Sequence, residues 1–244
     1  MKTRYLLFIL ILSVLSLFLV LKFYLTPESV TEIDKRDKTD TVIPLFQEAN
    51  LPIGKVIIDP GHGGKEWGAV GWKSEVPEKE INLAIATYAK DYLENNHVEV
   101  AMTRYLDEMM DDKDLNADLT ARAQFAEKIA ADLFVSIHSD QFDKEIEGTR
   151  IFYSDKNPKV KESQILGEVI FDELISKLGS KPLGVKEENY RVLDQNTVPS
   201  VLIEVGFLSH PEEEMKLVDP AYQKKAGEAI AMGIIKYLKT NQRK

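Results

Sequence analysis

Three polar residues stand at the ends of apolar runs in this sequence, and their side chains are of the kinds that bind metals or move protons. His62 lies in the glycine-rich turn after "VIID", His138 ends "LFVSIH", and Glu204 lies near the end of "SVLIEV". The 244 residues contain 4 histidines and no cysteine, so a metal would have to be held by His, Asp or Glu. Two histidines, a carboxylate and an open position for water are the parts of a catalytic zinc site. The sequence therefore predicts a metal site assembled from separate segments.

Glu204 is the most informative of these residues because its neighbours are apolar. An isolated ionised carboxylate within "VLIEV" would be strongly destabilised by the loss of water unless it is paired or lies beside a metal. We therefore expect Glu204 to face a site, where it is the best candidate for a general base. The competing interpretation makes Glu204 one half of a structural ion pair.

Three carboxylates around the start of one predicted helix are alternatives for the third metal ligand. Glu78 follows Pro77, which fixes the direction of the chain, and Glu75 and Glu80 are its competitors. Spacing alone does not rank these three residues. A glutamate at a helix start also has an ordinary role, which is to stabilise the helix dipole.

Four further residues each have a functional or an ordinary interpretation. Arg104 closes "VEVAMT" and is expected at the rim of the same site, while Asp59 either orients His62 or only ends its strand. His97 lies between a helix end and a strand and is interpreted as a C-terminal cap. His210 precedes a proline and is interpreted as a solvated residue in preference to an added ligand.

Alternating apolar patterns define the elements that have to position these side chains. Helices that alternate with continuous apolar strands predict an α/β domain with a mainly parallel sheet that is flanked by helices on both faces. Open sheets of this kind bind ligands beyond the carboxyl ends of their strands. The predicted strands are 55–59, 98–103, 133–138, 148–154 and 200–205, with a short one at 190–193, and the predicted helices are 77–96, 118–131, 158–178 and 221–239.

The first part of the chain differs in composition from this domain. The run 5–21 is uncharged and rich in leucine, with basic residues on both sides. It predicts an uncleaved signal anchor, a transmembrane segment over 1–25 that would leave the catalytic domain on the extracytoplasmic side of the cell membrane. Cleavage of the segment would instead give a secreted protein. Residues 26–52 are polar without periodicity and predict a linker to a domain over 53–244.

Charge disfavours one class of partner. The net charge is -9, and the strongest basic cluster consists only of Lys35, Arg36 and Lys38 among acidic residues. Because nucleic-acid binding relies on clustered Lys and Arg, we expect no nucleic-acid partner. The hydrophobic content of 44% predicts one sizeable core.

Several blocks follow one another in a specific order: "IIDPGHGG", "PEKEINLAIA", "LTARAQFAE", "ADLFVSIHSD" and "VPSVLIEVGFLSHPEEE". In these blocks the sequence resembles the zinc-dependent N-acetylmuramoyl-L-alanine amidases of bacterial cell walls, the amidase 3 family. The resemblance covers about 53–238. It implies a single α/β domain with a twisted sheet, and hydrolysis of the amide between the lactyl group of N-acetylmuramic acid and L-alanine.

The resemblance also implies roles for individual residues. His62, Glu78 and His138 match the zinc ligands and Glu204 matches the catalytic glutamate, which decides among the three competing carboxylates. Zinc would lower the pKa of its bound water, and Glu204 would carry the proton of that water to the departing amine. Asp140 departs from the family, in which Asn usually takes this place, and is expected to change zinc affinity or substrate fit.

Peptidoglycan is the substrate that the resemblance implies, with the membrane reached through the N-terminal segment. The short chain, with an anchor and without wall-binding repeats, is similar to the spore-cortex subgroup of this family. Two competing functions are another zinc hydrolase of wall peptides, such as a carboxypeptidase, and a non-catalytic wall-binding or regulatory domain. Some related amidases carry a helix that blocks the site, but the polar stretch 107–119 is interpreted as a loop. The need for an activator protein stays open.

Overall fold

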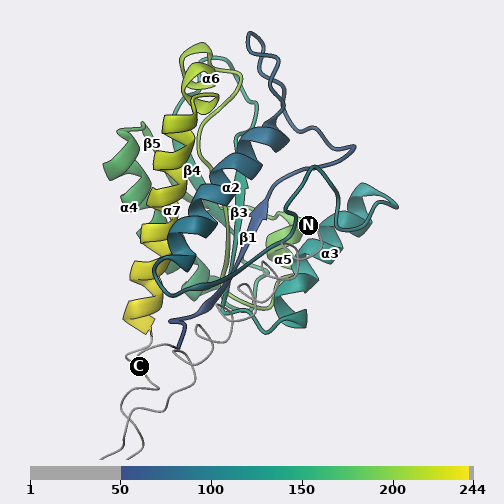
Figure 1. Ribbon diagram of the computed structural model, residues 1–244, viewed down its shortest axis with the longest axis vertical. Coiled ribbons are helices and arrows are strands. Elements are labelled where there is room, and N and C mark those ends of the chain that lie inside the picture. The colour runs from purple at the N-terminus through teal and green to yellow at the C-terminus, as the bar shows by residue number, and fades with distance from the viewer. Residues whose placement is uncertain (1–50, 242–244) are drawn as a thin grey trace, which may run out of the picture. The chain divides into compact units, whose positions relative to one another are not determined.

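The structure is a computed structural model that describes residues 51–241, and one six-stranded sheet forms its centre (Figure 1). Its strands are β1 (Lys55–Pro60), β2 (Glu99–Met102), β3 (Leu133–His138), β4 (Thr149–Tyr153), β5 (Pro182–Glu187) and β6 (Ser200–Glu204). They lie in the order β2-β1-β3-β6-β4-β5. Within this sheet β4 and β6 pair antiparallel, and every other pair of neighbours is parallel.

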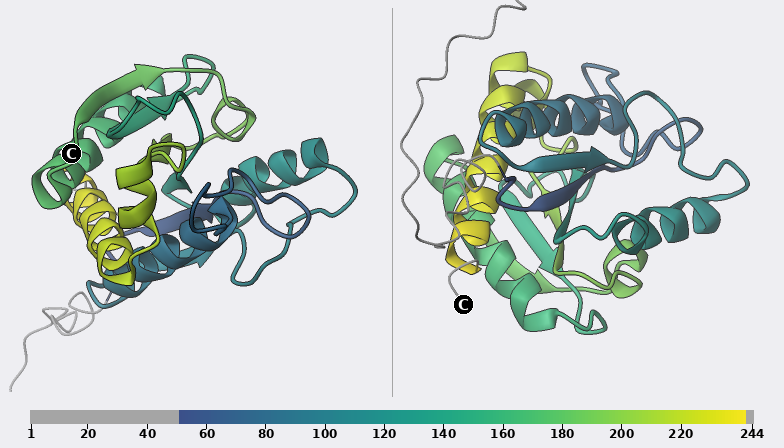
Figure 2. Two further views of the ribbon diagram at one scale, coloured as in Figure 1. Left: turned by 90° about the horizontal axis from the view of Figure 1, so that it is seen from above. Right: turned by 60° about the horizontal axis from the view of Figure 1, so that its bottom comes forward.

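Helices cover both faces of the sheet. In the described part of the chain they are α2 (Glu78–Glu94), α3 (Leu115–Lys128), α4 (Val160–Leu178), α5 (Arg191–Asp194), α6 (Pro211–Leu217) and α7 (Pro220–Asn241). Helix α7 lies between α2 and α4 and packs against both, which makes one layer (Figure 1). Helices α3 and α5 contact each other on the other side of the sheet (Figure 2).

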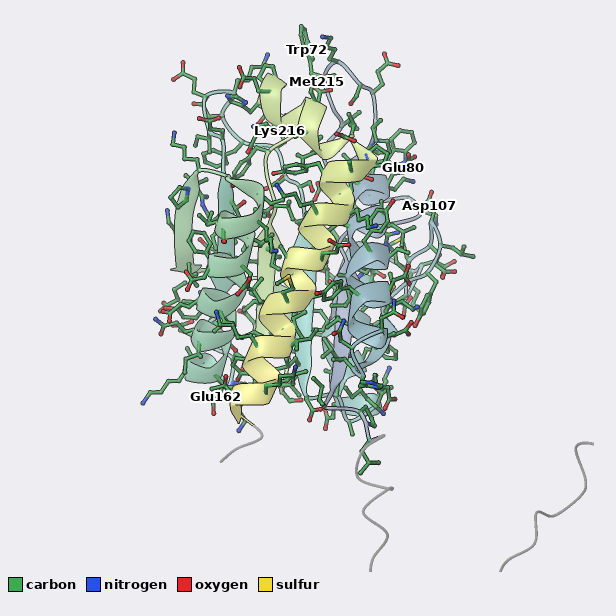
Figure 3. All side chains as sticks on the ribbon, turned by 60° about the vertical axis from the view of Figure 1, so that its left-hand side comes forward. Trp72, Glu80, Asp107, Glu162, Met215 and Lys216 are labelled. Carbon is green, nitrogen blue, oxygen red and sulfur yellow. The ribbon has the colours of Figure 1, made fainter. Side chains whose placement is uncertain are left out.

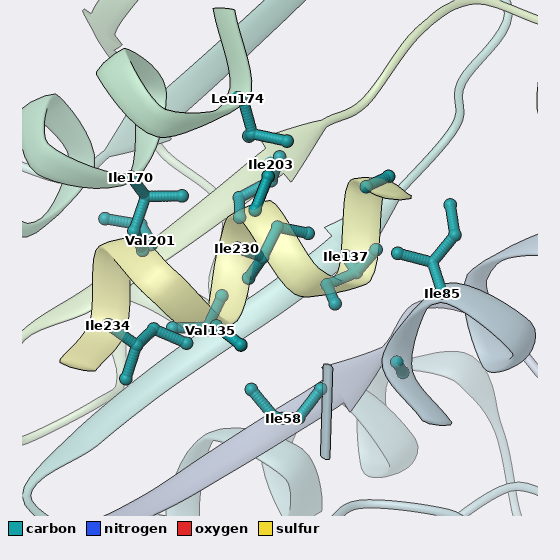
Figure 4. Packing of buried hydrophobic residues seen from close by; sticks show 14 of the residues in the cluster. Ile58, Ile85, Val135, Ile137, Ile170, Leu174, Val201, Ile203, Ile230 and Ile234 are labelled. Atoms are coloured by element: carbon teal, nitrogen blue, oxygen red, sulfur yellow. The ribbon is translucent and has the colours of Figure 1, made fainter. Parts of the chain in front are cut away.

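Alternation along the strands separates the core into two clusters. Val56 and Ile58 of β1 belong to the cluster under α2, α4 and α7, while Ile57 between them belongs to the cluster under α3 and α5. In the larger cluster Ile230 and Ile234 of α7 pack over the apolar side chains of β3 and β6 (Figure 4). Because β1, β3 and β6 are covered on both faces, each carries a run of three consecutive apolar residues: 56–58, 133–135 and 201–203.

The predicted fold class is confirmed: a single domain with a mainly parallel sheet is flanked by helices on both faces. One element was predicted wrongly, because 191–193 belongs to the short helix α5, of which Tyr190 is the N-cap, and the strand of this region is β5. Helix α6 was not predicted. Residues 107–114 form the expected loop, but α3 begins at Leu115, where the side chain of Asp114 accepts a hydrogen bond from the amide of Ala117 as an N-cap.

The predicted anchor over 1–25 and nearly all of the predicted linker over 26–52 lie outside the described residues. Within 51–241, none of the helices combines the length and the apolar character that a membrane span requires.

Helix α7 approaches α2 closely because a glycine stands at the contact. A Cβ atom on Gly227 would lie 2.6 Å from the carbonyl oxygen of Ile85 and 2.7 Å from the Cβ of Tyr88. Real Cβ atoms do not come so close to backbone atoms. Gly227 therefore sets the spacing between the two helices.

Gly227→Ala is expected to destabilise the protein by about 1–3 kcal/mol, since overpacking outweighs the gain in helix propensity of about 1 kcal/mol. The midpoint of urea denaturation measures this change. Ser176→Ala, on an exposed position of α4, is the matched control and should leave the midpoint nearly unchanged. A higher midpoint for Gly227→Ala would show that α7 has room to move away from α2.

Candidate metal centre

The first histidine of the site lies in the turn that follows β1. His62 has a φ of 62°, a left-handed conformation that is uncommon outside glycine, and Gly63 and Gly64 continue the turn with positive φ. Arg122 of α3 holds this conformation, because its Nη2 donates to the carbonyl oxygen of His62 at 2.7 Å. Arg104 donates from Nε to the carbonyl of Pro60 at 3.0 Å and so fixes the entry to the turn.

Glu78, the first residue of α2, supplies a fully buried carboxylate. Its Oε2 accepts the amide of Ala69 at 2.9 Å, and its Oε1 accepts the side-chain amide of Asn82 at 3.0 Å and the amide of Ser139 at 3.0 Å. Gly68 makes room for the carboxylate, since a Cβ there would lie 2.5 Å from Oε2 and its φ is 66°. The competitors Glu75 and Glu80 are exposed.

Both histidines face this carboxylate. The Nε2 of His62 lies 3.2 Å from Oε2 of Glu78, and the Nδ1 of His138 lies 3.0 Å from Oε1. The two imidazole rings meet edge to face, with centroids 4.9 Å apart. One ligand atom from each of the three side chains lies within 4.8 Å of the others.

These residues fit a zinc ion by the chemistry of their donors. Two imidazole nitrogens and one carboxylate oxygen, from the turn after β1, the start of α2 and the end of β3, are a set of three ligands of the kind that would leave a fourth position for water or substrate. The hydrogen bonds that Glu78 accepts from Asn82 and Ser139 are of the kind that orient a ligating carboxylate.

The two histidines keep Glu78 ionised. Burial alone would raise the pKa of Glu78, but its hydrogen bonds with His138 and His62 and the charges of both rings lower that pKa well below the usual value. Burial likewise acts to lower the pKa of His62, and Glu78 outweighs it, so that the pKa of His62 is raised.

Glu204 lies on the strand beside the second histidine. In the parallel register of β3 and β6, Glu204 is the partner of His138, and its Oε2 accepts the amide of Asp140 at 3.0 Å. Its exposed fraction is 4%. Burial, helped by the repulsion of Glu78 and Asp140, raises the pKa of Glu204 well above its usual range.

A pocket of about 250 Å³ joins Glu204 to both histidines. Helix α3 forms one wall with Leu115 and Leu119, and the start of α5 forms another with Tyr190 and Arg191. Sequence reasoning missed these wall residues, because nothing in their spacing differs from that of ordinary core and surface positions.

Asp59 does not touch the ring of His62. Its carboxylate accepts from Arg122 Nη1 at 2.9 Å, from Ser136 Oγ at 2.7 Å and from Thr103 Oγ1 at 2.5 Å. The interpretation that Asp59 orients His62 directly is therefore wrong, and its influence passes through Arg122. Arg122 itself was missed, although its position four residues after Asp118 in a predicted helix was a signal for an ion pair.

Arg104 is 1% exposed and supports the site from within, where the sequence predicted a position at its rim. Its Nη2 donates to the carbonyls of Gly61 at 3.0 Å and Lys79 at 2.8 Å, so it ties the turn after β1 to the first turn of α2.

The remaining sequence candidates take different places. Asp140 lines the pocket beside Glu204. His210 is the N-cap position of α6, is half-buried and does not belong to the metal group, so it is no added ligand, but it is not fully solvated either.

His97 closes the end of α2. Its φ is 61°, and its amide donates to the carbonyl of Glu94 at 3.2 Å, while the amide of Val98 donates to that of Leu93 at 3.1 Å. This geometry agrees with the interpretation of His97 as a C-terminal cap.

The turn after His62 continues into a long loop that is fastened at its far end. Oε1 of Glu214 in α6 accepts the amides of Lys73 at 2.8 Å and Ser74 at 2.6 Å. Figure 3 shows Trp72 of this loop and Met215 of α6 at the same end of the molecule. The loop therefore connects the metal centre to α6.

An α/β domain that brings two histidines, the buried carboxylate of Glu78 at the start of α2 and a second buried carboxylate together at the carboxyl ends of its strands has the arrangement of a metal-dependent hydrolase. The family N-acetylmuramoyl-L-alanine amidase, amidase 3, matches residues 56–236, and the chain belongs to it. Members of this family hydrolyse peptidoglycan.

Two curated relatives are similar over most of this chain. A germination-specific N-acetylmuramoyl-L-alanine amidase of Bacillus subtilis is 36% identical over 77% of the chain and 82% of its own length. An uncharacterised cell wall amidase of Bacillus anthracis is 33% identical over 87% of the chain. The chain spans 43% of the length of that second relative.

A solved structure agrees with the fold. The CwlD amidase from Clostridioides difficile, in complex with the GerS lipoprotein, has a TM-score of 0.70 and 32% sequence identity. The match covers 77% of this chain and 99% of that one.

Arg122→Met is expected to destabilise the protein by about 3–5 kcal/mol, since it leaves the buried carboxylates of Asp59 and Asp118 without their partner. Denaturant titration measures the change. Lys113→Met is the control, because Lys113 is 78% exposed in its ion pair with Asp111, and such pairs contribute about 0–1 kcal/mol. Equal effects of the two substitutions would contradict the role given to Arg122.

Proposed function

We propose that this chain hydrolyses the amide between the lactyl group of N-acetylmuramic acid and L-alanine, with zinc held by His62, Glu78 and His138. The observation that carries the proposal is the buried carboxylate of Glu78 between two imidazole nitrogens at 3.2 and 3.0 Å. Family membership supports the substrate and the bond. Glu204 is the proposed general base.

Each residue of the site has a task in this reaction. Zinc held by His62, Glu78 and His138 would supply Lewis-acid chemistry, polarising the scissile carbonyl and lowering the pKa of a water. Glu204 takes a proton from the attacking water and transfers it to the nitrogen of L-alanine as the amide bond breaks. The amide of Asp140, which donates to Glu204 Oε2 at 3.0 Å, holds the carboxylate in place for both transfers.

The burial of Glu204 suits this double task. In the metal-free protein burial and the repulsion of Glu78 and Asp140 raise the pKa of Glu204, and a zinc ion held by Glu78 would act against that rise. A buried carboxylate without an ion-pair partner can accept a proton from water and return it to a departing amine.

Glu204→Gln is expected to lower kcat by about 10²- to 10⁴-fold while zinc content stays that of the wild type. Purified chain is incubated with peptidoglycan, and mass spectrometry follows the appearance of peptides with a free N-terminal L-alanine. Metal analysis of the same samples gives the zinc content. Near-full activity of the variant would remove Glu204 from the mechanism.

The same assay separates the competing functions. Release of L-alanine peptides from intact glycan, lost on chelation and restored by zinc, supports the amidase. A cut elsewhere in the peptide would indicate a carboxypeptidase-like hydrolase, and zinc binding without any cleavage would indicate a wall-binding or regulatory domain.

In chelated protein, Glu204→Gln is expected to be more stable than the wild type near neutral pH. Because the folded state binds the proton of Glu204 more tightly than the unfolded state does, wild-type stability falls as pH rises from about 4.5 toward the raised pKa. Neutral glutamine removes that loss of stability. The Tm of Glu204→Gln should therefore exceed that of the wild type at about pH 8, and the two Tm values should be equal below about pH 4. Thermal denaturation followed by circular dichroism measures it.

The control for this stability measurement is Glu75→Gln at an exposed position, which should leave Tm unchanged at both pH values. A decrease in Tm for Glu204→Gln at about pH 8 would mean that the ionised carboxylate is well compensated in the folded protein.

We also propose that residues 1–25 anchor the chain in the cell membrane and that the linker over 26–52 carries the catalytic domain, residues 53–244, on the extracytoplasmic side, where the wall lies. The germination-specific relative supports a role in spore peptidoglycan. The relative that was solved with a lipoprotein supports a search for an activating partner. Recovery of the full chain in the cytosolic fraction would contradict the membrane location.

A further inference from the structure

Arg150 of β4 differs from the other two arginines that surround the site. Arg104 and Arg122 are both 1% exposed, and their guanidinium groups donate to backbone carbonyls and carboxylates on every side. The Nε of Arg150 is buried and has no hydrogen-bond partner among the described residues. Buried polar groups nearly always have a hydrogen-bond partner, so the unpartnered Nε of Arg150 requires a physical reason.

The terminal nitrogens of Arg150 are also unpartnered, but they reach solvent. No hydrogen bond or ion pair within 51–241 includes them, and unlike Nε they are not among the fully buried polar atoms. The side chain as a whole is half-buried. The guanidinium of Arg150 therefore has terminal N–H donors that reach solvent and are free to bind a ligand.

Aromatic rings hold this guanidinium in place. Its Cζ lies 5.7 Å from the centroid of Phe152 and 5.8 Å from that of Phe207, and both rings are buried. Stacking on aromatic faces fixes the plane of a guanidinium without using its N–H donors. The donors stay available for a planar partner with two oxygens.

Arg150 lies beside the candidate base. In the antiparallel register of β4 and β6 it is the partner of Glu204, and β3 with His138 follows on the other side of β6. Its charge acts on both Glu204 and Tyr190, which line the pocket. The open edge of Arg150 thus adjoins the reaction site on the side away from His62.

We propose that Arg150 binds a carboxylate of the stem peptide, on the residue that follows L-alanine, and so selects the substrate of the amidase. A guanidinium matches a carboxylate through two parallel N–H···O bonds. The inference rests on the proposed function, because it assumes that the scissile carbonyl lies at the metal centre.

The spacing of the strands agrees with this choice of carboxylate. Neighbouring strands are about 4.8 Å apart, so Arg150 and His138, two strands apart, are separated by about 9–10 Å. Two extended residues span about 7 Å, which brings the residue after L-alanine within reach of a long arginine side chain. The lactyl carboxylate that hydrolysis creates would instead lie at the metal centre itself.

The test compares two peptidoglycan fragments of equal glycan length that carry either a carboxylate or a carboxamide on the residue after L-alanine. For the zinc-loaded wild-type enzyme, kcat/KM is expected to favour the carboxylate by about tenfold or more. Arg150→Met should lose this preference through a higher KM for the carboxylate substrate, while any effect of the lost charge on Glu204 changes kcat equally for both substrates. Arg150→Lys, which keeps the charge without the planar fork, should retain part of it.

Lys161→Met is the matched control, since it removes one exposed positive charge from α4 on the opposite face of the sheet. It should keep the full preference. An equal loss of activity toward both substrates in Arg150→Met would overturn the proposal and assign Arg150 to the support of Glu204. A wild-type enzyme without preference would overturn it as well.

A second measurement does not need turnover. Calorimetry compares the binding of an L-alanyl peptide with a free carboxylate and its carboxamide form to the wild type and to Arg150→Met. Preferential binding that Arg150→Met abolishes supports the carboxylate site even if the enzyme cuts another bond, so failure of the proposed function is distinguished from failure of this inference. Equal binding of both peptides to the wild type refutes it.

Discussion

Asp59, Glu78 and Glu204 are carboxylates buried near the carboxyl ends of the strands, and each must be compensated for its loss of water. Asp59 is compensated by Arg122 in an ion pair at 2.9 Å, Glu78 by three N–H donors and two imidazoles, and Glu204 by a single amide. The pKa values of Asp59 and Glu78 are therefore lowered, while burial raises that of Glu204. The surroundings therefore give the same carboxylate group three different roles: Asp59 is a structural anchor, Glu78 a candidate ligand and Glu204 a candidate base.

The structural anchor decides where the ligands lie. Arg122 pairs with Asp59 and at the same time donates to the carbonyls of Pro60 and His62, so the left-handed turn that presents the imidazole depends on an ion pair beneath it. Arg104 extends this support to the start of α2 through the carbonyls of Gly61 and Lys79. Buried arginines thus satisfy carbonyls of a turn whose own backbone ladder is limited to the bridge between Gly63 and Glu66.

The site residues that could be predicted from sequence are polar residues within or at the end of apolar strands, where burial would be unfavourable without a functional reason. Glu204 in an apolar strand and His138 at the end of another are visible because a polar group there requires a reason. Glu78 could not be separated from Glu75 and Glu80, because only the fold shows which of them is buried. Strand β5 contains a proline and a glycine and lies half-exposed at the sheet edge, so its pattern resembles a loop.

The wall residues of the pocket were beyond the reach of sequence for another reason. Leu115 and Leu119 look like ordinary helix positions, and Arg150 looks like the outward residue of an alternating strand. The place of Arg150 beside Glu204 comes from the antiparallel pairing of β4 with β6, which is a long-range feature. The place of Leu115 comes from the early start of α3, which the N-cap Asp114 sets locally.

The pocket combines apolar and charged groups in its walls. The wall on α3 carries Leu115 and Leu119 but also Asp118 and Arg122, while the start of α5 adds Tyr190 and Arg191. A sugar ring offers apolar faces and hydroxyls, and a stem peptide offers carboxylates, so both parts of a peptidoglycan fragment would find complementary groups there. Because the proposed metal centre would act only on a carbonyl and a water, contacts with the walls are needed to place one amide, out of the many in the polymer, at the reacting position.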